Sequence, residues 1–459
     1  MRLHKNLVIF LIILALAAPS FAAQGRAKLP QSAYLKSAKI AILGNPPRYG
    51  EAMQLLDTML FYYGQIPEGY FLRGNVYAEY ANKENDLNKK LDLFIKMSGN
   101  YDSMVIACDN KELKSGLKSD CNKYGGVVDS IRTLYWRENY NSGVQTIDTV
   151  NDLDKRIRSA SDSAEILSLQ KQMQMTADSG RFFFQIAATV DPSRYRAYEG
   201  IGLIYDRLKQ YDSSLIWLKK ASDLVPDTAY LVQNMAYSYI QMDDWDNAII
   251  YFKKYLGMVP NDASTCFNIA ICYSNQRLYD SSYAWDVKTI ALDPKISGAY
   301  VDAGQYFLVR SQNIYDSIKT YKDAGDSAHA NQISKLRNTY LDSSAYFLKT
   351  AHALAPDNVQ VLEQLAVVLF ARANFQDALE AFKKLTELEP NRKEYWISVG
   401  DIYIQLQKFS DAIAPYEKAT ELDPGDVKLW EVLRDLYNNN KMPEKAKAAE
   451  AKIAELQKM

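Results

Sequence analysis

The sequence predicts an all-α fold, a superhelical solenoid of antiparallel helix pairs in which one hairpin is elongated. Two observations lead to this prediction. Prolines follow helix-like segments at a fixed interval, and the segments between them repeat one apolar pattern with helical spacing. The prolines are Pro192, Pro226, Pro260, Pro294, Pro356, Pro390 and Pro424, so the gaps are 34, 34, 34, 62, 34 and 34 residues. A fixed period of this length indicates stacked copies of one helical unit.

The segment 393–426 shows the repeated unit most completely. Its marked positions are Trp396, Val399, Gly400 and Tyr403 in the first half and Ala412, Tyr416, Ala419 and Pro424 in the second. Similar units begin at Tyr195, Ala229 and Val359, and a weaker one begins at Ala263. At these positions the chain resembles the tetratricopeptide-repeat (TPR) family, of an exported bacterial type. The resemblance implies helix pairs that stack into a superhelix and bind other proteins.

Two further features recur within the unit. The eighth residue of the first helix is small in six copies, which predicts a close approach of the second helix; these residues are Gly202, Ala236, Ala270, Gly304, Ala366 and Gly400. An aromatic residue followed by a short polar one stands between the helices, at Tyr211-Asp212, Trp245-Asp246, Tyr279-Asp280 and Phe409-Ser410. We expect these Asp and Ser side chains to cap the second helix by accepting a free backbone N–H.

The first residues have the layout of a secretory signal peptide. Arg2 and Lys5 precede an apolar run from Leu7 to Ala18, and Ser20 and Ala22 then supply the small residues three back from, and at, a cleavage point. The run is shorter than the roughly 20 residues needed to cross a bilayer, although an uncleaved anchor is an alternative. We therefore expect a signal peptide over 1–22, a flexible leader over 23–33, and an exported chain in the periplasm or secreted.

The segment 34–192 is expected to form divergent or elongated TPR-like helices. A long helix should run from about Val127 to Val150, and a second should end before Pro192, while 97–126 reads as a loop or short helices. Cys108 and Cys121 lie in that segment and are possible disulfide partners in an oxidising compartment, although two free thiols are the alternative. Cys266 and Cys272 are expected to be small buried apolar residues.

The remaining sequence divides into three parts. Regular repeats should occupy 193–294, and regular repeats with a terminal cap should occupy 359–459. Between them, 295–358 holds one repeat with 28 extra residues. Shared equally between two helices, these add about 14 residues to each, or about 21 Å. We expect a protruding helical hairpin there.

Composition and motifs disfavour several functional classes. The 54 Lys and Arg residues balance 55 Asp and Glu residues, which gives no basic surplus for a nucleic-acid partner. Neither His329 nor His352 belongs to a metal-binding spacing, and there is no complete phosphate-binding glycine loop. We expect no catalytic site, no cofactor and no metal, with an unrecognised site in the N-terminal third as the remaining enzymatic alternative.

The family resemblance implies a concave groove lined by particular positions of the first helices. Transferred to this chain, the central groove residues are Tyr230, Tyr237, Ile240, Phe267, Ile271, Val301, Leu308, Val367 and Phe370. An apolar groove suits extended or helical segments of other proteins. Two alternatives stay open: these side chains pack on one another or on the leader, or the convex face or the inserted hairpin drives assembly of an envelope complex. The lysine, asparagine and arginine with which some family members hold a terminal carboxylate are absent. The oligomeric state is not indicated.

Overall fold

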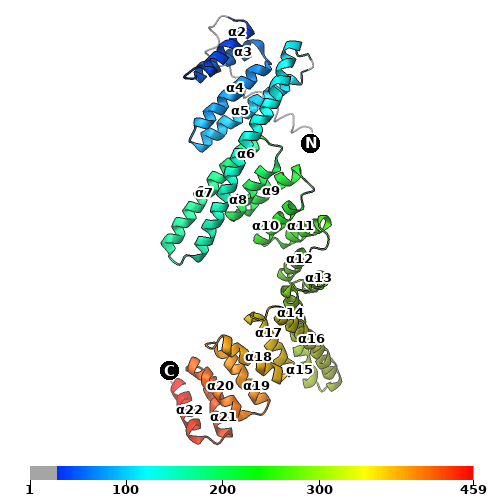
Figure 1. Ribbon diagram of the computed structural model, residues 1–459. Helices are drawn as coiled ribbons and strands as arrows, with labels where there is room; N and C mark the ends of the chain where they lie inside the picture. Colours follow the sequence, from blue (N-terminus) through cyan, green and yellow to red (C-terminus); the bar gives the residue numbers. More distant parts are fainter. Residues whose placement is uncertain (1–27, 111, 458–459) are drawn as a thin grey trace. The chain divides into compact units, whose positions relative to one another are not determined.

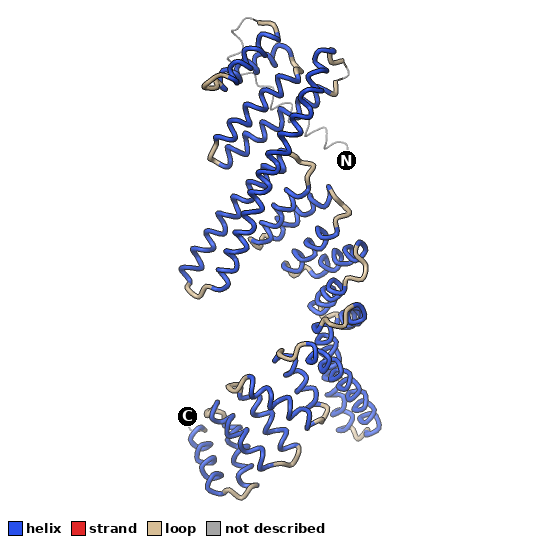
Figure 2. Tube along the Cα trace, viewed as in Figure 1, coloured by secondary structure: helices blue, strands red, loops and turns tan. Residues whose placement is uncertain are grey.

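The computed structural model describes residues 28–110 and 112–457, and every regular element in these ranges is an α-helix (Figures 1 and 2). The predicted all-α array of helix pairs is confirmed. The predicted signal peptide lies outside the described residues. The chain forms two compact units that divide between Met242 and Asp243, and each unit is considered by itself.

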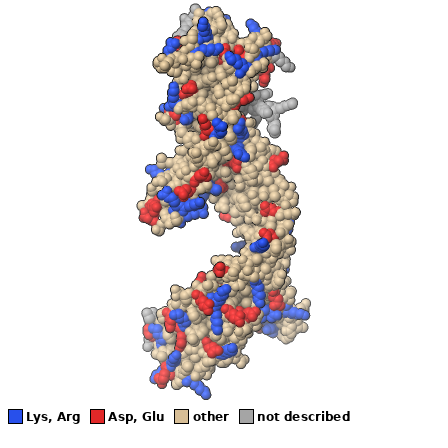
Figure 3. All heavy atoms as spheres, viewed as in Figure 1, with Lys and Arg blue, Asp and Glu red and all other residues tan. Residues whose placement is uncertain are grey.

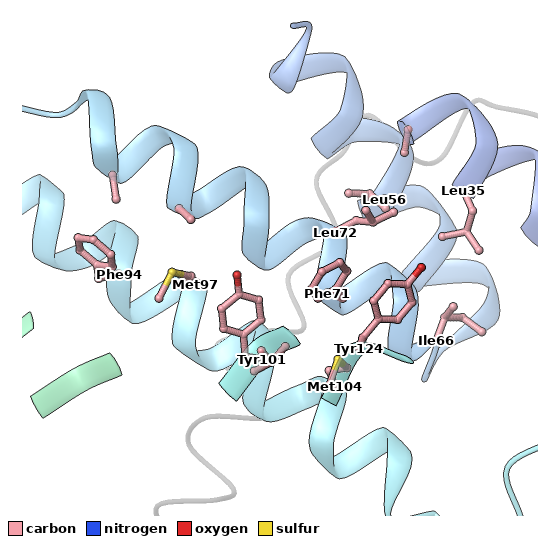
Figure 4. Packing of buried hydrophobic residues seen from close by; sticks show 14 of the residues in the cluster. Leu35, Leu56, Ile66, Phe71, Leu72, Phe94, Met97, Tyr101, Met104 and Tyr124 are labelled. Carbon is pink, nitrogen blue, oxygen red and sulfur yellow. The ribbon is translucent and has the colours of Figure 1, made fainter. Parts of the chain in front are cut away.

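The first unit begins with four helices around an aromatic core. They are α2 (Gln31–Leu43), α3 (Tyr49–Tyr63), α4 (Pro67–Lys83) and α5 (Leu87–Cys108). Figure 4 shows Phe71 of α4 beside Tyr124, and their rings stack with centroids 4.3 Å apart. Tyr124 also donates a hydrogen bond to the buried Glu68, which Lys39 neutralises at 2.5 Å. A carboxylate buried in this core is therefore paired.

Two long helices come next in the chain, α6 (Ser115–Ser159) and α7 (Ser163–Val190). The 45 residues of α6 make a helix of about 68 Å. Its first half packs on α4 and α5, and its second half packs on α7 (Figure 1). The prediction that 97–126 forms a loop or short helices is wrong, because α5 and α6 cover most of it. Glycines in this stretch each cost a helix about 0.5–1 kcal/mol, and the packing of both helices against the core outweighs that cost.

The cysteines of this region are joined. Cys108, the last residue of α5, forms a disulfide with Cys121 in the second turn of α6, and the two Cα atoms are 5.7 Å apart. The bond fastens the end of one helix to the start of the next. Cys266 and Cys272 are buried and unbonded, as small apolar residues would be.

The regular helix pairs repeat one geometry. In the first unit the helices are α8 (Tyr195–Arg207), α9 (Tyr211–Leu224) and α10 (Ala229–Gln241). In the second they are α11 (Trp245–Met258), α12 (Ala263–Asn275), α13 (Tyr279–Leu292), α17 (Val359–Ala371), α18 (Phe375–Leu388), α19 (Lys393–Gln405), α20 (Phe409–Leu422), α21 (Val427–Asn439) and α22 (Pro443–Leu456). First helices have 13 residues and second helices 14. Each pair buries its apolar side chains against neighbouring helices.

A left-handed residue ends the first helix of each regular pair, always two positions after its last helical residue. These residues are Lys209, Asp243, Arg277, Ala373, Gln407 and Lys441, with φ between 56° and 65°. The next backbone N–H donates to the carbonyl five residues earlier, as from Gln210 to Tyr205 at 2.9 Å. This bond satisfies a carbonyl that the helix end leaves free. None of the six is glycine, so the stacked helices, rather than local preference, impose the turn.

The capping prediction for the second helices is wrong. Each of these helices begins at the aromatic residue, so Asp212, Asp246, Asp280 and Ser410 lie one position inside the helix. There the carboxylates face the positive end of the helix dipole without capping it. In α11 the cap is Asp244, whose side chain accepts from the N–H of Asn247 at 3.2 Å.

The inserted hairpin is present, and its two arms are nearly equal in length. The second arm, α16 (Ser327–Leu354), has 28 residues, twice the regular length. The first arm spans 297–323 but is broken at Ile314 into α14 (Ser297–Asn313) and the short α15 (Tyr315–Asp323). Each arm is about 14 residues longer than a regular helix, as expected, but the break in the first arm was not predicted. Gly325, with φ of 78°, forms at the tip the same left-handed turn as in the regular pairs.

The small residue at the eighth position yields a testable prediction. A Cβ added at Gly400 would lie 2.5 Å from the ring of Tyr416, which is buried and held by a hydrogen bond to Asp401. Gly400→Ala should therefore destabilise the chain by about 1–3 kcal/mol. Gly257→Ala, in a helix where no atom lies within 4 Å of the new Cβ, should stabilise it by about 0.5–1 kcal/mol. Urea unfolding followed by circular dichroism measures both, and shifts of the same sign would contradict the packing argument.

The disulfide yields a second prediction. The bond closes a short chain loop with a sequence separation of 13 residues, which restricts the unfolded state. Replacing both Cys108 and Cys121 by Ser should lower the free energy of unfolding of the N-terminal helices by about 3 kcal/mol. Dithiothreitol should reproduce this loss in the natural chain and change nothing further in the double variant. A natural chain whose unfolding midpoint does not respond to reduction would show that the bond is not formed.

Candidate functional site

The predicted groove residues of the first unit lie on α10. The side chains of Tyr230 and Tyr237 are 39% and 41% exposed, and Ile240 is half-buried. The Tyr230 hydroxyl lies 3.1 Å from Glu199 Oε2 and 3.2 Å from the Tyr195 hydroxyl, both on α8. Burial raises the pKa of Glu199, and together with these hydrogen bonds it raises the pKa of Tyr230. Hydrogen bonds thus link the first helices of successive pairs, and the exposed Tyr230 takes part in them.

The other predicted groove residues lie in the second unit, on α12, α14 and α17. Val367 is 42% exposed, whereas the rest are half-buried, namely Phe267, Ile271, Val301, Leu308 and Phe370. Several of these pack against neighbours in the chain. The Phe267 ring fills the space beside Gly298, and the Phe370 ring lies 5.8 Å from that of Phe375. Hence none of the nine groove residues is fully buried, but only Tyr230, Tyr237 and Val367 are exposed rather than half-buried.

A cavity of about 970 Å³ adjoins Tyr237 in the first unit. Its walls come from the last turns of α6, from the end of α8 and the turn after it, and from α9 and α10. The lining residues are Asn151, Asp154, Lys155, Arg158, Leu203, Asp206, Arg207, Lys209, Tyr211, Leu218, Asn234, Tyr237, Ser238 and Gln241. Reasoning from the repeat found Tyr237, but it missed the wall from α6, which has no counterpart in a regular repeat.

Acidic and basic side chains are interspersed over the surface shown in Figure 3, without a continuous basic stripe on that face. Among residues 28–110 and 112–457, no group of three or more His, Cys, Asp or Glu side chains could hold a metal ion. Over the same ranges, no helix is both long and apolar enough to cross a membrane.

The most perturbed carboxylates are Asp286 of α13 and Asp302 of α14. Asp286 is 1% exposed, and neither of its oxygens has a hydrogen-bond partner. Burial, reinforced by the charge of Asp302, raises the pKa of Asp286 to about 8, and burial raises the pKa of Asp302 to about 6. The side chain of Ser282 lowers the pKa of Asp286 and so opposes part of this rise. A carboxyl so fully enclosed cannot reach a substrate, so this pair is a feature of the core.

Comparison with protein families matches three parts of the chain to models described as tetratricopeptide repeat. They cover residues 195–228, 233–262 and 363–427. These matches fall on α8 and α9, on α10 and α11, and on α17 to α20, the helix pairs with regular geometry. The fold defines a helical repeat protein, and the matches identify the class. These three segments are tetratricopeptide repeats. Such repeats typically mediate protein–protein interaction, and proteins built from them are typically non-catalytic. No curated protein matches the chain.

Several solved structures resemble parts of the chain. The TPR protein YrrB, described as having an unusual peptide-binding site, is 19% identical, with 45% of this chain and 92% of YrrB covered and a TM-score of 0.35. A TPR protein from Parabacteroides merdae is 13% identical, with 64% of this chain and 99% of that protein covered and a TM-score of 0.35. MamA is 16% identical, with 41% of this chain and 95% of MamA covered and a TM-score of 0.31. At this level of similarity they say nothing about what this chain binds.

The buried acid pair predicts a dependence of stability on pH. Because both pKa values exceed the unfolded value of about 3.9, the folded chain holds protons that the unfolded chain releases. Stability contributed by the pair should be complete below pH 4 and should fall as pH rises from about 4 to about 8. Asp286→Asn should remove much of this fall and raise stability at pH 8 by about 1–3 kcal/mol.

Urea unfolding midpoints at pH 4 and pH 8 provide the measurement. The exposed Asp357→Asn, which removes the same charge, is the matched control and should leave the pH dependence as in the natural chain. An Asp286→Asn protein that loses stability between pH 4 and pH 8 as much as the natural chain would contradict the assignment.

Proposed function

We propose that this chain is a non-catalytic scaffold or adaptor of the cell envelope that binds extended or helical segments of partner proteins on the first-helix face of its repeats. The observation that carries the proposal is the exposure of Tyr230, Tyr237 and Val367, at 39%, 41% and 42%, on first helices where the family resemblance places the groove. Exposed aromatic and aliphatic side chains at helix spacing suit an amphipathic partner segment.

Two features support an envelope location. The Cys108–Cys121 bond is of a kind that persists in oxidising compartments and is rare in the cytosol. The apolar run from Leu7 to Ala18, preceded by positive charge, has the layout of a signal peptide.

A second candidate function is assembly of a larger complex through the inserted hairpin. Tyr315, Leu336 and Tyr346 on this hairpin are 57%, 44% and 65% exposed. Apolar side chains that a hairpin carries into solvent are candidates for a contact with another protein.

In-cell crosslinking of tagged protein, followed by identification of the captured proteins by mass, distinguishes the two functions. The groove variant Tyr237→Ala/Val367→Asp removes exposed apolar surface from first helices. Its matched control is Ile216→Asp/Ile250→Asp, at exposed positions of the second helices α9 and α11. We expect specific partners with the natural chain and the control, and a loss of about tenfold or more with the groove variant, since buried aromatic anchors dominate such interfaces.

The hairpin variant Leu336→Asp/Tyr346→Ala tests the second candidate in the same experiment. Loss of partners with this variant alone would replace the adaptor function by assembly through the hairpin. Equal capture by the natural chain and the groove variant would contradict groove binding. Circular dichroism of every variant shows that a loss of partners is not a loss of folding.

A further inference from the structure

The cavity beside Tyr237 has a wall that the repeat itself does not supply. The last turns of α6 contribute Asn151, Asp154, Lys155 and Arg158 to its lining. Arg207 of α8 donates from Nε to Asn151 Oδ1 at 2.7 Å, which ties this wall to the first helix of the adjacent pair. The cavity is thus held between a long helix and the first-helix face of α8 and α10, within one compact unit.

The charges in this cavity are unbalanced. Its lining contains four cations, Lys155, Arg158, Arg207 and Lys209, but two carboxylates, Asp154 and Asp206. Both carboxylates are engaged, by Arg158 at 2.6 Å and by Arg207 at 3.2 Å. Lys155 and Lys209 have no ion-pair partner within the described part of the chain, and both are exposed.

The two lysines belong to different elements of the cavity lining. Lys155 belongs to α6, and Lys209 is the left-handed residue that ends the first helix of its pair, with φ of 58°. Tyr211, Tyr237 and Leu203 add apolar surface to the same lining. Two cations without an ion-pair partner, together with apolar surface in one cavity, complement a segment in which carboxylates flank an apolar side chain.

We infer that this cavity selects acidic segments of partner proteins, with Lys155 and Lys209 holding carboxylates while an apolar side chain of the segment lies against Tyr237. The inference rests on the proposed groove function and names the kind of partner for it. Lys155 stands in the elongated α6, outside the regular repeat, whereas Lys209 stands in the turn of a regular pair.

The chain's own leader is a poor occupant. Residues 23–33 contain Arg26 and Lys28 and no carboxylate, so the leader would bring like charge to the cavity. The described end of the leader is also held elsewhere, since the Tyr63 hydroxyl on α3 donates to the carbonyl of Leu29 at 2.6 Å. Charge and position both favour an acidic segment from another protein.

The test selects a displayed library of short random peptides on the full natural chain. We expect the enriched peptides to carry net negative charge with an apolar residue between acidic ones, and to bind more weakly at high salt. A representative peptide should bind Lys155→Glu/Lys209→Glu about tenfold more weakly in fluorescence anisotropy. The control Lys36→Glu/Lys118→Glu has the same change in net charge at exposed positions outside the cavity and should bind as the natural chain does.

Three results would overturn the inference: enriched peptides that are neutral or basic, no enrichment over the starting library, or equal loss in the two lysine variants. Enriched neutral peptides that lose affinity with Tyr237→Ala/Val367→Asp would leave groove binding intact and refute only the preference for acidic segments. If crosslinking recovers the same partners from the groove variant and the lysine variant as from the natural chain, groove binding itself is refuted.

Discussion

The close approach of the two helices in each pair is the constraint on which the solenoid depends. A residue with little or no side chain stands where the helices cross, and at Gly202, Gly304 and Gly400 a Cβ would meet the second helix at 2.5–2.9 Å. The ring or aliphatic side chain of the second helix occupies the space instead. Because a Gly or Ala stands at this position of α8, α10, α12, α14, α17 and α19, these pairs present their neighbours with similar surfaces, and the array grows by stacking.

The N-terminal unit shows how a lengthened repeat changes the packing around it. A helix of 45 residues cannot be covered by one 14-residue neighbour, so α6 takes successive partners along its length. It closes the aromatic core around Phe71 at one end and packs on α7 at the other. Phe184 of α7 fits where Gly143 of α6 and Gly200 of α8 leave room for its ring. The same extension brings Lys155 into the lining of the cavity beside Tyr237, so an elongated helix adds charge next to an exposed aromatic side chain of a regular pair.

Much of the fold could be predicted because the same helix pair recurs several times, so each copy of the sequence pattern supports the same structure. The groove could be placed on particular first helices by position, but the exposure of its residues could not. Ile271 and Val367 are both the ninth residue of their first helix, yet Ile271 is half-buried while Val367 is exposed. The difference depends on the neighbouring pair, which a single repeat does not encode. Prediction fails for segments outside the pattern, such as 97–126, because glycine and polar residues dominate the local signal there while tertiary packing decides the structure.

The sequence by itself determined the helix pairs, their period, the small residue at each crossing and the cysteines able to pair, because these depend on spacing along one chain segment. Only the tertiary structure decided where the second helices start, where the first arm of the inserted hairpin breaks, and which side chains meet across helices. The left-handed turns at Lys209 and Ala373 illustrate the reason. Neither residue favours that conformation, and the stacked helices on both sides hold it. The buried Asp286 beside Asp302 and the lysines facing the cavity likewise acquire their properties from residues distant in sequence.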